Sequence, residues 1–400
     1  MRIEMNNVDR AAANLARRGL CFATYMLLAF TAGRAQQLRL HNPSSFSRID
    51  EVVEVPIPQL LAHTHIKSDQ LPSLVAVNEV GASIPSQLYS HEISGPPSLL
   101  LLMVQIPPNG TTIIRFHIDS KIVSQTALVF GRPVPERKDD FAWENQLVAY
   151  RIYGPALEAT GEISSGIDVW SKRIPNFVIN DFYNRDATHD PALSYHKDTG
   201  QGLDSYDVGP SRGCGGTAVW TGSALDASKN YTVANIISSG PIRFEFEISY
   251  APWKSGDVEV TERKRITLDA GTHLNKIVST YTFAGGLPLK LAAGIAVHKG
   301  ADVTAEKASG IASVWDTPQD PAAGRIATGI VALPSEHAEA LSAVNHALLI
   351  FTRKSGEPFT YYAGAGWSKA DMPTEQDWNA YLVRFLDARE HPIALSWSEK

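Results

Sequence analysis

The chain of 400 residues contains only two cysteines, Cys21 and Cys214. Because Cys21 lies in an apolar N-terminal run, the pair provides neither a disulfide framework nor a cysteine-based metal site. The sequence also lacks the phosphate-binding pattern GxxxxGKS and a strand-GxGxxG-helix unit, so nothing in it indicates a nucleotide cofactor. The HExxH pattern of helical zinc sites is absent as well.

A strong excess of one charge is missing too. The chain has 36 Lys and Arg against 42 Asp and Glu, a formal net charge of -6. Since no basic run occurs beyond the N-terminus, we predict no nucleic-acid partner. The twelve histidines are scattered and none falls at a helical metal-ligand spacing. We predict no cofactor, with Ca²⁺ held by scattered aspartates and carbonyls left open. The sequence does not define the oligomeric state.

The first 35 residues have the order of a secretory signal peptide. Arg17 and Arg18 precede an apolar run over residues 20–32, which small residues follow up to Ala35. The run is short for a membrane span, although an uncleaved anchor is the alternative. We predict cleavage after Ala35, a periplasmic or secreted mature protein, and no membrane association once the peptide is removed.

Most of the remaining chain has the pattern of β-strands. Short aliphatic segments separated by Pro, Gly and Asn predict a small N-terminal β-sandwich over residues 36–127, with a helix near 58–63. Pro107-Pro108-Asn109-Gly110 is typical of a hairpin turn between two such strands. Longer strands follow over 128–400. One of them, residues 243–248, alternates strictly, as a half-buried antiparallel strand should.

One helix is predicted, near the C-terminus. Thr374 with Asp377 three residues on makes an N-terminal cap, and apolar residues follow at a spacing of three to four residues. The sequence therefore predicts an all-β protein with one C-terminal helix, divided into a small sandwich and a large antiparallel domain.

Charged side chains are concentrated among apolar ones in residues 131–173. In an extended segment Asp140 and Glu144 share one face, and such a pair could act as acid and nucleophile or base in glycoside hydrolysis. Alternatively the two carboxylates pair with Arg137 and Arg151 as buried ion pairs, which imitate active sites. Both readings stay open.

A second candidate segment is irregular and rich in glycine, over residues 176–222. If Tyr195-His196-Lys197-Asp198 is extended, His196 and Asp198 share one side, so that a carboxylate could orient an imidazole. The alternative is that His196 only fixes the loop by hydrogen bonding. Glycines beside aromatic, carboxylate and amide side chains suit a sugar ring, which predicts a carbohydrate partner.

The sequence resembles the domain-of-unknown-function 4861 family of secreted bacterial proteins. The matching pieces are FGRPVPERKDDFAWEN, YGPALEATGE, SGIDVWSKR, YHKDTGQGLDSYDVG, YAPW, LDAGTHLNKI and AAGIAVH. The resemblance implies a companion of polysaccharide degradation, especially of uronic-acid-containing glycans. It also implies an antiparallel β-supersandwich similar to that of galactose mutarotases.

The functional hypothesis is a lyase or hydrolase acting on uronic-acid-containing oligosaccharides. The alternative is a non-catalytic glycan-binding protein or a sugar mutarotase. β-Elimination needs a cation for the uronate carboxylate, a base and an acid. The candidates are Arg151 or Arg137 for the carboxylate, His196 or Lys197 for the base, and Tyr195 or Tyr206 for the acid. A hydrolase would instead use Asp139, Asp140, Glu144 or Asp198. The substrate-binding candidates are Lys138, Asp139, Trp143, Asn145, Asp198, Asp204, Trp170 and His298. These roles require the two segments to meet at one sugar-sized hollow.

Overall fold

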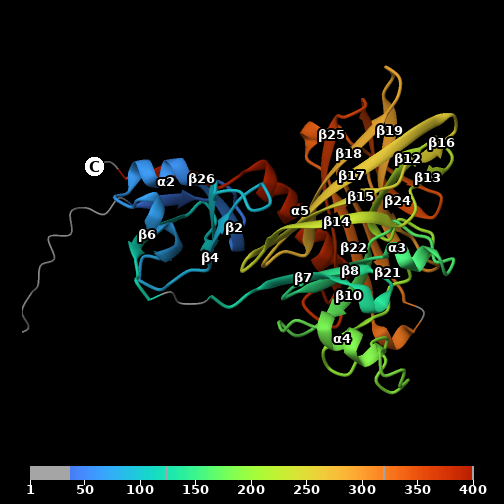
Figure 1. Ribbon diagram of the computed structural model, residues 1–400, viewed down its shortest axis with the longest axis horizontal. Coiled ribbons are helices and arrows are strands. Elements are labelled where there is room, and N and C mark those ends of the chain that lie inside the picture. Colours follow the sequence, from blue (N-terminus) through green and yellow to red (C-terminus); the bar gives the residue numbers. More distant parts are fainter. Residues whose placement is uncertain (1–36, 122–124, 308, 319, 399–400) are drawn as a thin grey trace, which may run out of the picture. The chain divides into compact units, whose positions relative to one another are not determined.

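The computed structural model describes residues 37–121, 125–307, 309–318 and 320–398 (Figure 1). The predicted signal peptide and its cleavage after Ala35 fall on residues outside these ranges. In the part of the chain that is described, no helix has the length and apolar character that a membrane crossing requires.

The described chain is mostly antiparallel β-sheet with one long C-terminal helix, as predicted. Two small sheets form the N-terminal sandwich, with strand orders β26-β1-β6-β3 and β2-β5-β4. Their strands are β1 (Leu38–His41), β2 (Arg48–Pro56), β3 (Leu74–Val77), β4 (Ser86–Tyr89), β5 (Leu99–Ile106), β6 (Thr111–Ile118) and β26 (Ala394–Trp397). Because β26 pairs with β1, the C-terminal strand completes a sheet of the N-terminal sandwich. The short helix predicted after β2 is α2 (Ile57–His63).

The predicted hairpin at Pro107–Gly110 is wrong in its pairing. The turn exists, since Gly110 N donates to Pro107 O at 3.1 Å and Asn109 has a positive φ. However, β5 pairs with β2 and β4, whereas β6 pairs with β1 and β3, so the turn connects two sheets. The physical reason is that β5 is apolar on both faces. Leu102 packs in the sandwich core while Leu101 packs in the core of the larger sheets.

Three larger sheets make up the rest of the chain (Figure 1). The first has the order β11-β10-β9-β8-β7, the second β13-β12-β19-β24-β23, and the third β14-β15-β17-β18-β25-β22-β21-β20 with β16 on β17. Their strands are β7 (Val129–Val134), β8 (Asp140–Asn145), β9 (Val148–Ile152), β10 (Asp168–Lys172), β11 (Gly202–Asp204), β12 (Cys214–Trp220), β13 (Leu225–Asp226), β14 (Tyr231–Ser239), β15 (Arg243–Tyr250), β16 (Trp253–Ser255), β17 (Val258–Asp269), β18 (Leu274–Phe283), β19 (Leu289–Ala296), β20 (Asp302–Ala305), β21 (Ile311–Asp316), β22 (Ile326–Val331), β23 (Glu339–Ala343), β24 (His346–Arg353) and β25 (Pro358–Trp367).

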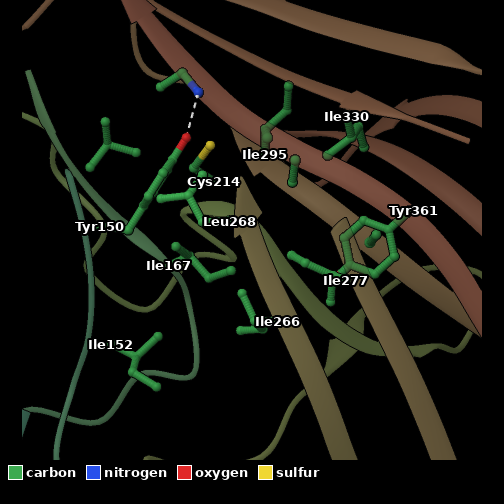
Figure 2. Close-up of a cluster of buried hydrophobic side chains, with 14 of the residues drawn as sticks. Tyr150, Ile152, Ile167, Cys214, Ile266, Leu268, Ile277, Ile295, Ile330 and Tyr361 are labelled. Atoms are coloured by element: carbon green, nitrogen blue, oxygen red, sulfur yellow. Dashed lines mark hydrogen bonds between the residues drawn. The ribbon is translucent and has the colours of Figure 1, made fainter. Parts of the chain in front are cut away.

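The faces of these sheets enclose one large apolar core. Figure 2 shows part of it, with Tyr150 of β9 beside Cys214 of β12 and Leu268 of β17. Tyr150 keeps its hydroxyl satisfied there, since it accepts from Ala365 N at 3.3 Å and donates to the carbonyl oxygen of His273. Because both hydrogen bonds of the buried hydroxyl are made, Tyr150 connects two sheets at little desolvation cost.

The strand over residues 243–248 is confirmed as antiparallel, but its predicted half-burial is wrong. Strand β15 lies between β14 and β17, and Arg243 and Glu245 are buried at 7% and 4% exposure. Both have partners: Arg243 pairs with Asp269, and Glu245 accepts from Tyr89 at 2.8 Å. Arg243 and Glu245 thus face packed side chains instead of solvent, whereas Glu247 stays partly exposed.

Three α-helices of the described residues accompany the larger sheets. Helix α5 (Glu375–Glu390) begins at Thr374, whose side chain accepts from Asp377 N at 3.2 Å, as the sequence predicts. Its buried face carries Trp378, Leu382 and Phe385. Two shorter helices are α3 (Pro155–Glu158) and α4 (Ile179–Asp186). Helix α4 lies in the segment predicted to be irregular, so that prediction is wrong for residues 179–186.

Candidate functional site

The two candidate segments meet at the sheet that contains β9, β10 and β11. Arg151 Nε donates to Asp168 Oδ2 at 2.9 Å, and its Nη2 lies 3.2 Å from Asp204 Oδ2. Its Nη1 donates to the hydroxyl of Tyr195 at 3.3 Å. These side chains are all nearly inaccessible, with Arg151 at 4% exposure. The segments therefore meet as predicted, but around a buried ion-pair network and not around a hollow.

This network contains more carboxylates than cations. Burial raises the pKa of Asp140 to about 6 against the opposing charges of Arg151 and Arg137. Burial also raises the pKa of Asp168, and it raises that of Asp204 well above its usual value. Burial alone would lower the pKa of Arg151, but Asp168 and Asp204 raise it well above its usual value. Burial thus favours the protonated forms of these three carboxylates, while the two guanidinium groups oppose it.

Glu144 does not join Arg151. It pairs with Lys172 of β10 at 2.6 Å, and both side chains are fully buried. The same carboxylate accepts from the backbone N–H groups of Val178 and Ile179, each at 2.9 Å. Glu144 therefore supplies the N-terminal cap of α4 from strand β8, and the hypothesis that it contacts substrate beside Arg151 is not supported by its position.

Residues 195–198 form a turn, so the extended geometry assumed for them is wrong. The ring of His196 is 60% exposed, and its Nδ1 lies 3.0 Å from the carbonyl oxygen of Asp204. Lys197 is exposed, whereas Tyr195 is buried against Trp170. Asp198 forms a salt bridge with Arg173. His196 and Asp198 consequently have different partners.

The other sequence candidates are placed as follows. Trp143 is buried and its Nε1 donates to Asn275 at 2.7 Å, while Asn145 donates to two carbonyl oxygens of the 269–272 loop. Lys138 and Asp139 are exposed in a turn with positive φ. Tyr206 is buried, and its hydroxyl has no protein partner among the described residues.

His298 carries both ring protons. Its Nδ1 bonds to the carboxylate of Asp316 and its Nε2 lies 2.8 Å from the carbonyl oxygen of Asp207. Both partners only accept hydrogen bonds. The bond to Asp316 raises the pKa of His298 although burial opposes it. His298 is thus a partly buried imidazolium at the end of β19.

A cleft of about 930 Å³ lies outside the ion-pair network of Arg151. Residues 46–52 of the N-terminal sandwich line it together with residues 269–273, 369–372 and part of α5 between residues 381 and 389. Phe46 and Ile49 add large apolar surface that is 38% and 69% exposed. A hollow of this size with both polar and apolar walls is what a sugar-sized ligand requires.

A histidine–carboxylate pair stands in the cleft wall. His273 Nε2 lies 2.8 Å from Asp371 Oδ2, and Nδ1 lies 2.8 Å from the carbonyl oxygen of Ala365. Both partners can accept hydrogen bonds from the imidazole ring. Burial alone would raise the pKa of Asp371, but the hydrogen bond and charge of His273 bring it below its usual value. Asp371 is 46% exposed and so presents an oriented, ionised carboxylate to the cleft.

Cations outnumber carboxylates in the cleft wall. The six Lys and Arg residues are Arg48, Lys172, Arg173, Lys369, Arg384 and Arg389, against Asp50, Glu51, Asp269 and Asp371. In the part of the chain that the structure describes, Arg48, Lys369 and Arg384 form no salt bridge within 4.0 Å. Lys369 and Arg384 are exposed. The cleft therefore offers unpaired positive charge to a ligand beside the Asp371 carboxylate.

Two candidates from the sequence form salt bridges with cations that line the cleft. Glu144 holds Lys172, and Asp198 holds Arg173, whose guanidinium also stacks over Trp367 at 4.8 Å. Arg173 N further donates to Gln201 O at 3.1 Å. Part of this wall thus depends on the irregular segment, and Glu144 and Asp198 are positioning residues for Lys172 and Arg173.

Sequence reasoning did not single out His273, Asp371, Lys369 or Arg384. His273 lies inside LDAGTHLNKI, which carried the family resemblance, so that segment was the available signal. The other three follow β25 or lie on α5 without any motif. Among the described residues, no group of three His, Cys, Asp or Glu side chains is arranged to hold a metal ion.

The fold and the cleft together define a β-rich protein with a cationic, sugar-sized groove. The chain belongs to the family described as Domain of unknown function (DUF4861), whose model matches residues 40–395. It is also similar to Uncharacterized protein P7 of Formosa agariphila, with 29% identity over 378 residues that cover 90% of this chain and 92% of that protein.

Two solved structures from Enterococcus faecalis share the fold. One is described as a protein in the Glycosyl Hydrolase Family 38 and the other as an alpha-mannosidase, each with a TM-score of 0.50 over 91% of this chain. Identity is 10% and 11%, so the likeness is one of fold. The chain spans about half the length of each, 47% and 46%.

Proposed function

We propose that this protein is carbohydrate-active and takes an acidic, uronic-acid-containing oligosaccharide into the cleft, outside the cytoplasm. The observation that carries the proposal is that one cleft contains Lys369 and Arg384, which form no salt bridge, together with the oriented Asp371 carboxylate. Charge-assisted bonds from a guanidinium suit a uronate carboxylate. The fold shared with proteins described as glycosyl hydrolases supports a carbohydrate ligand.

The reaction that fits these groups is lyase or hydrolase chemistry with Asp371 as base. In elimination, cations on the uronate carboxylate acidify the C5 proton, which Asp371 removes. The electron pair forms the C4=C5 double bond while the leaving oxygen departs and takes a proton from solvent. In hydrolysis, Asp371 would instead accept a proton from a water that attacks C1, while the glycosidic C1–O bond breaks and the leaving oxygen takes a proton from solvent. His273 keeps Asp371 ionised in both cases.

The test is incubation of the protein with pectic, alginate-like and glucuronate-bearing oligosaccharides. Elimination gives an unsaturated product that absorbs in the ultraviolet, whereas hydrolysis gives a new reducing end without that absorbance. We expect Asp371→Asn to lower the rate by about 10²-fold or more, as for loss of a general base. Asp302→Asn removes an exposed carboxylate that does not line the cleft and is the matched control. Equal rates for wild type and Asp371→Asn would exclude Asp371 as the base.

A binding protein without chemistry is the second candidate, and one observation favours it. Glu144 and Arg151, two catalytic candidates of residues 131–173, are buried in ion pairs. Measurable binding of an acidic oligosaccharide with neither product would select this candidate and retain the cleft as the site.

A further inference from the structure

A second pocket, of about 470 Å³, surrounds a buried arginine. Residues 163–164, 223–228 and 344–346 line it together with Pro210 and Arg212. Arg212 is 4% exposed and precedes β12. Its backbone N–H donates to His346 Nε2 at 3.0 Å and its backbone oxygen accepts from Gly216 N at 2.8 Å. The arginine is therefore held in place from both sides of its peptide.

The guanidinium of Arg212 has unused donors. Nη1 donates to Ser165 Oγ at 2.8 Å and to Thr217 O at 3.3 Å, and Nη2 donates to Pro210 O at 3.1 Å. A guanidinium has five N–H donors, so Nε–H and one Nη2–H have no protein acceptor among the described residues. Two donors on one guanidinium suit two oxygens of one oxyanion.

The charge of Arg212 has no counterion either. No carboxylate of the described chain lies within 4.0 Å of it. The nearest acidic influence is Glu262, which already pairs with the buried Lys264 at 3.1 Å and accepts from Ser279 Oγ at 2.6 Å. Two buried cations thus share one carboxylate, and burial lowers the pKa of Arg212. An uncompensated buried charge of this kind is costly unless an anion completes it.

Two residues beside Arg212, Ser228 and His346, also favour a bound anion in this pocket. Ser228 lines the pocket at 5% exposure, and its Oγ is buried without a protein partner. His346 accepts at Nε2 from Arg212 N, and its Nδ1 lies 2.7 Å from Val344 O, to which it donates, so its ring is neutral. Burial lowers the pKa of His346 in agreement. The pocket therefore presents a cation and a free hydroxyl but no negative charge.

We propose that this pocket is an anion-binding site in which Arg212 and Ser228 hold the carboxylate or sulfate group of a small ligand. The site is separate from the cleft and does not depend on the function proposed for it. Two sources share this chemistry, a sugar acid and a free inorganic anion.

The test is calorimetric titration of the full chain with D-glucuronate, inorganic sulfate and glucose. The Lys369→Ala/Arg384→Ala variant serves as background, so that glucuronate binding in the cleft does not contribute. We expect saturable binding of at least one oxyanion and none of glucose. Tighter binding of glucuronate than of sulfate identifies a sugar acid, and the reverse identifies an inorganic anion.

Ser228→Ala should weaken the oxyanion about tenfold, as for loss of a hydrogen bond to a charged group. This variant keeps the fold because Ser228 Oγ has no bond to lose. Arg212→Gln should abolish binding, with the thermal unfolding transition as a check on folding. Absence of binding by either anion, or unchanged binding in Ser228→Ala, would overturn the proposal.

Discussion

Lys172→Met is the substitution with the largest predicted effect on stability. It removes one partner of the buried Glu144–Lys172 pair and leaves the carboxylate with the backbone N–H groups at the start of α4. Breaking a buried pair in this way costs about 3–5 kcal/mol. At about 2.1 cal/mol/K per residue over roughly 360 residues, the unfolding entropy is about 0.75 kcal/mol/K, so the Tm should fall by about 4–7 °C.

The assay is differential scanning calorimetry of wild type, Lys172→Met, Glu144→Gln and the double variant. Glu144→Gln leaves Lys172 with only the carbonyl oxygen of Asn145 at 2.6 Å. Because either single change leaves the other partner unpaired, the double variant should lose at least about 1 kcal/mol less than the sum of the single variants. Strict additivity, or a loss below about 1 kcal/mol for Lys172→Met, would refute the reasoning.

Three further predictions concern single residues. Asp140→Asn should change the pH dependence of stability: the raised pKa of about 6, against the usual 3.8, means that the folded protein binds this proton more tightly. Wild-type stability therefore falls as pH rises from about 4 to 6, by up to about 3 kcal/mol relative to the variant, and parallel urea-denaturation curves across that window would contradict this. Thr374→Ala should cost about 1 kcal/mol through loss of the α5 cap, measured by urea denaturation with Thr360→Ala as a strand control. Gly213→Ala should cost at least about 2 kcal/mol, because φ is +55° and a Cβ would lie 2.2 Å from Ile167 O; an unchanged Tm would contradict it.

Elements whose determinants are local could be predicted from the sequence. Helix α5 carries its own cap in Thr374 and its own apolar face, and both are visible along the chain. Helix α4 was not predicted because the N–H groups at its start donate to Glu144, which lies 34 and 35 positions earlier in the chain than the two donors. No local pattern can report a cap that another strand provides.

Burial on two faces explains the errors in the strands. The continuous apolar run of β5 fits a hairpin strand and a strand between two cores equally well. Only the structure shows that Leu101 and Leu102 enter different cores. The same holds for Glu245, which looks solvent-facing in the sequence but binds Tyr89 and Thr267.

The candidate site was predicted in part. A meeting of charged side chains from the two segments was expected, but the sequence does not show whether such charges face solvent or each other. His273 and Asp371 are 98 positions apart, so their pairing depends on the fold that brings β18 beside β25. No local sequence pattern links the two residues, and only the folded chain places both in the cleft wall.

The cationic cleft is the central claim, and ligand binding by cleft variants tests it most directly. A uronic-acid-containing oligosaccharide would be titrated calorimetrically into wild type and Lys369→Ala/Arg384→Ala, with Arg263→Ala/Lys307→Ala as the control for two exposed cations outside the cleft. We predict binding that the control retains, and that the cleft variant weakens by about tenfold or more through loss of two charge-assisted contacts. Equal affinity in all three proteins would contradict the account.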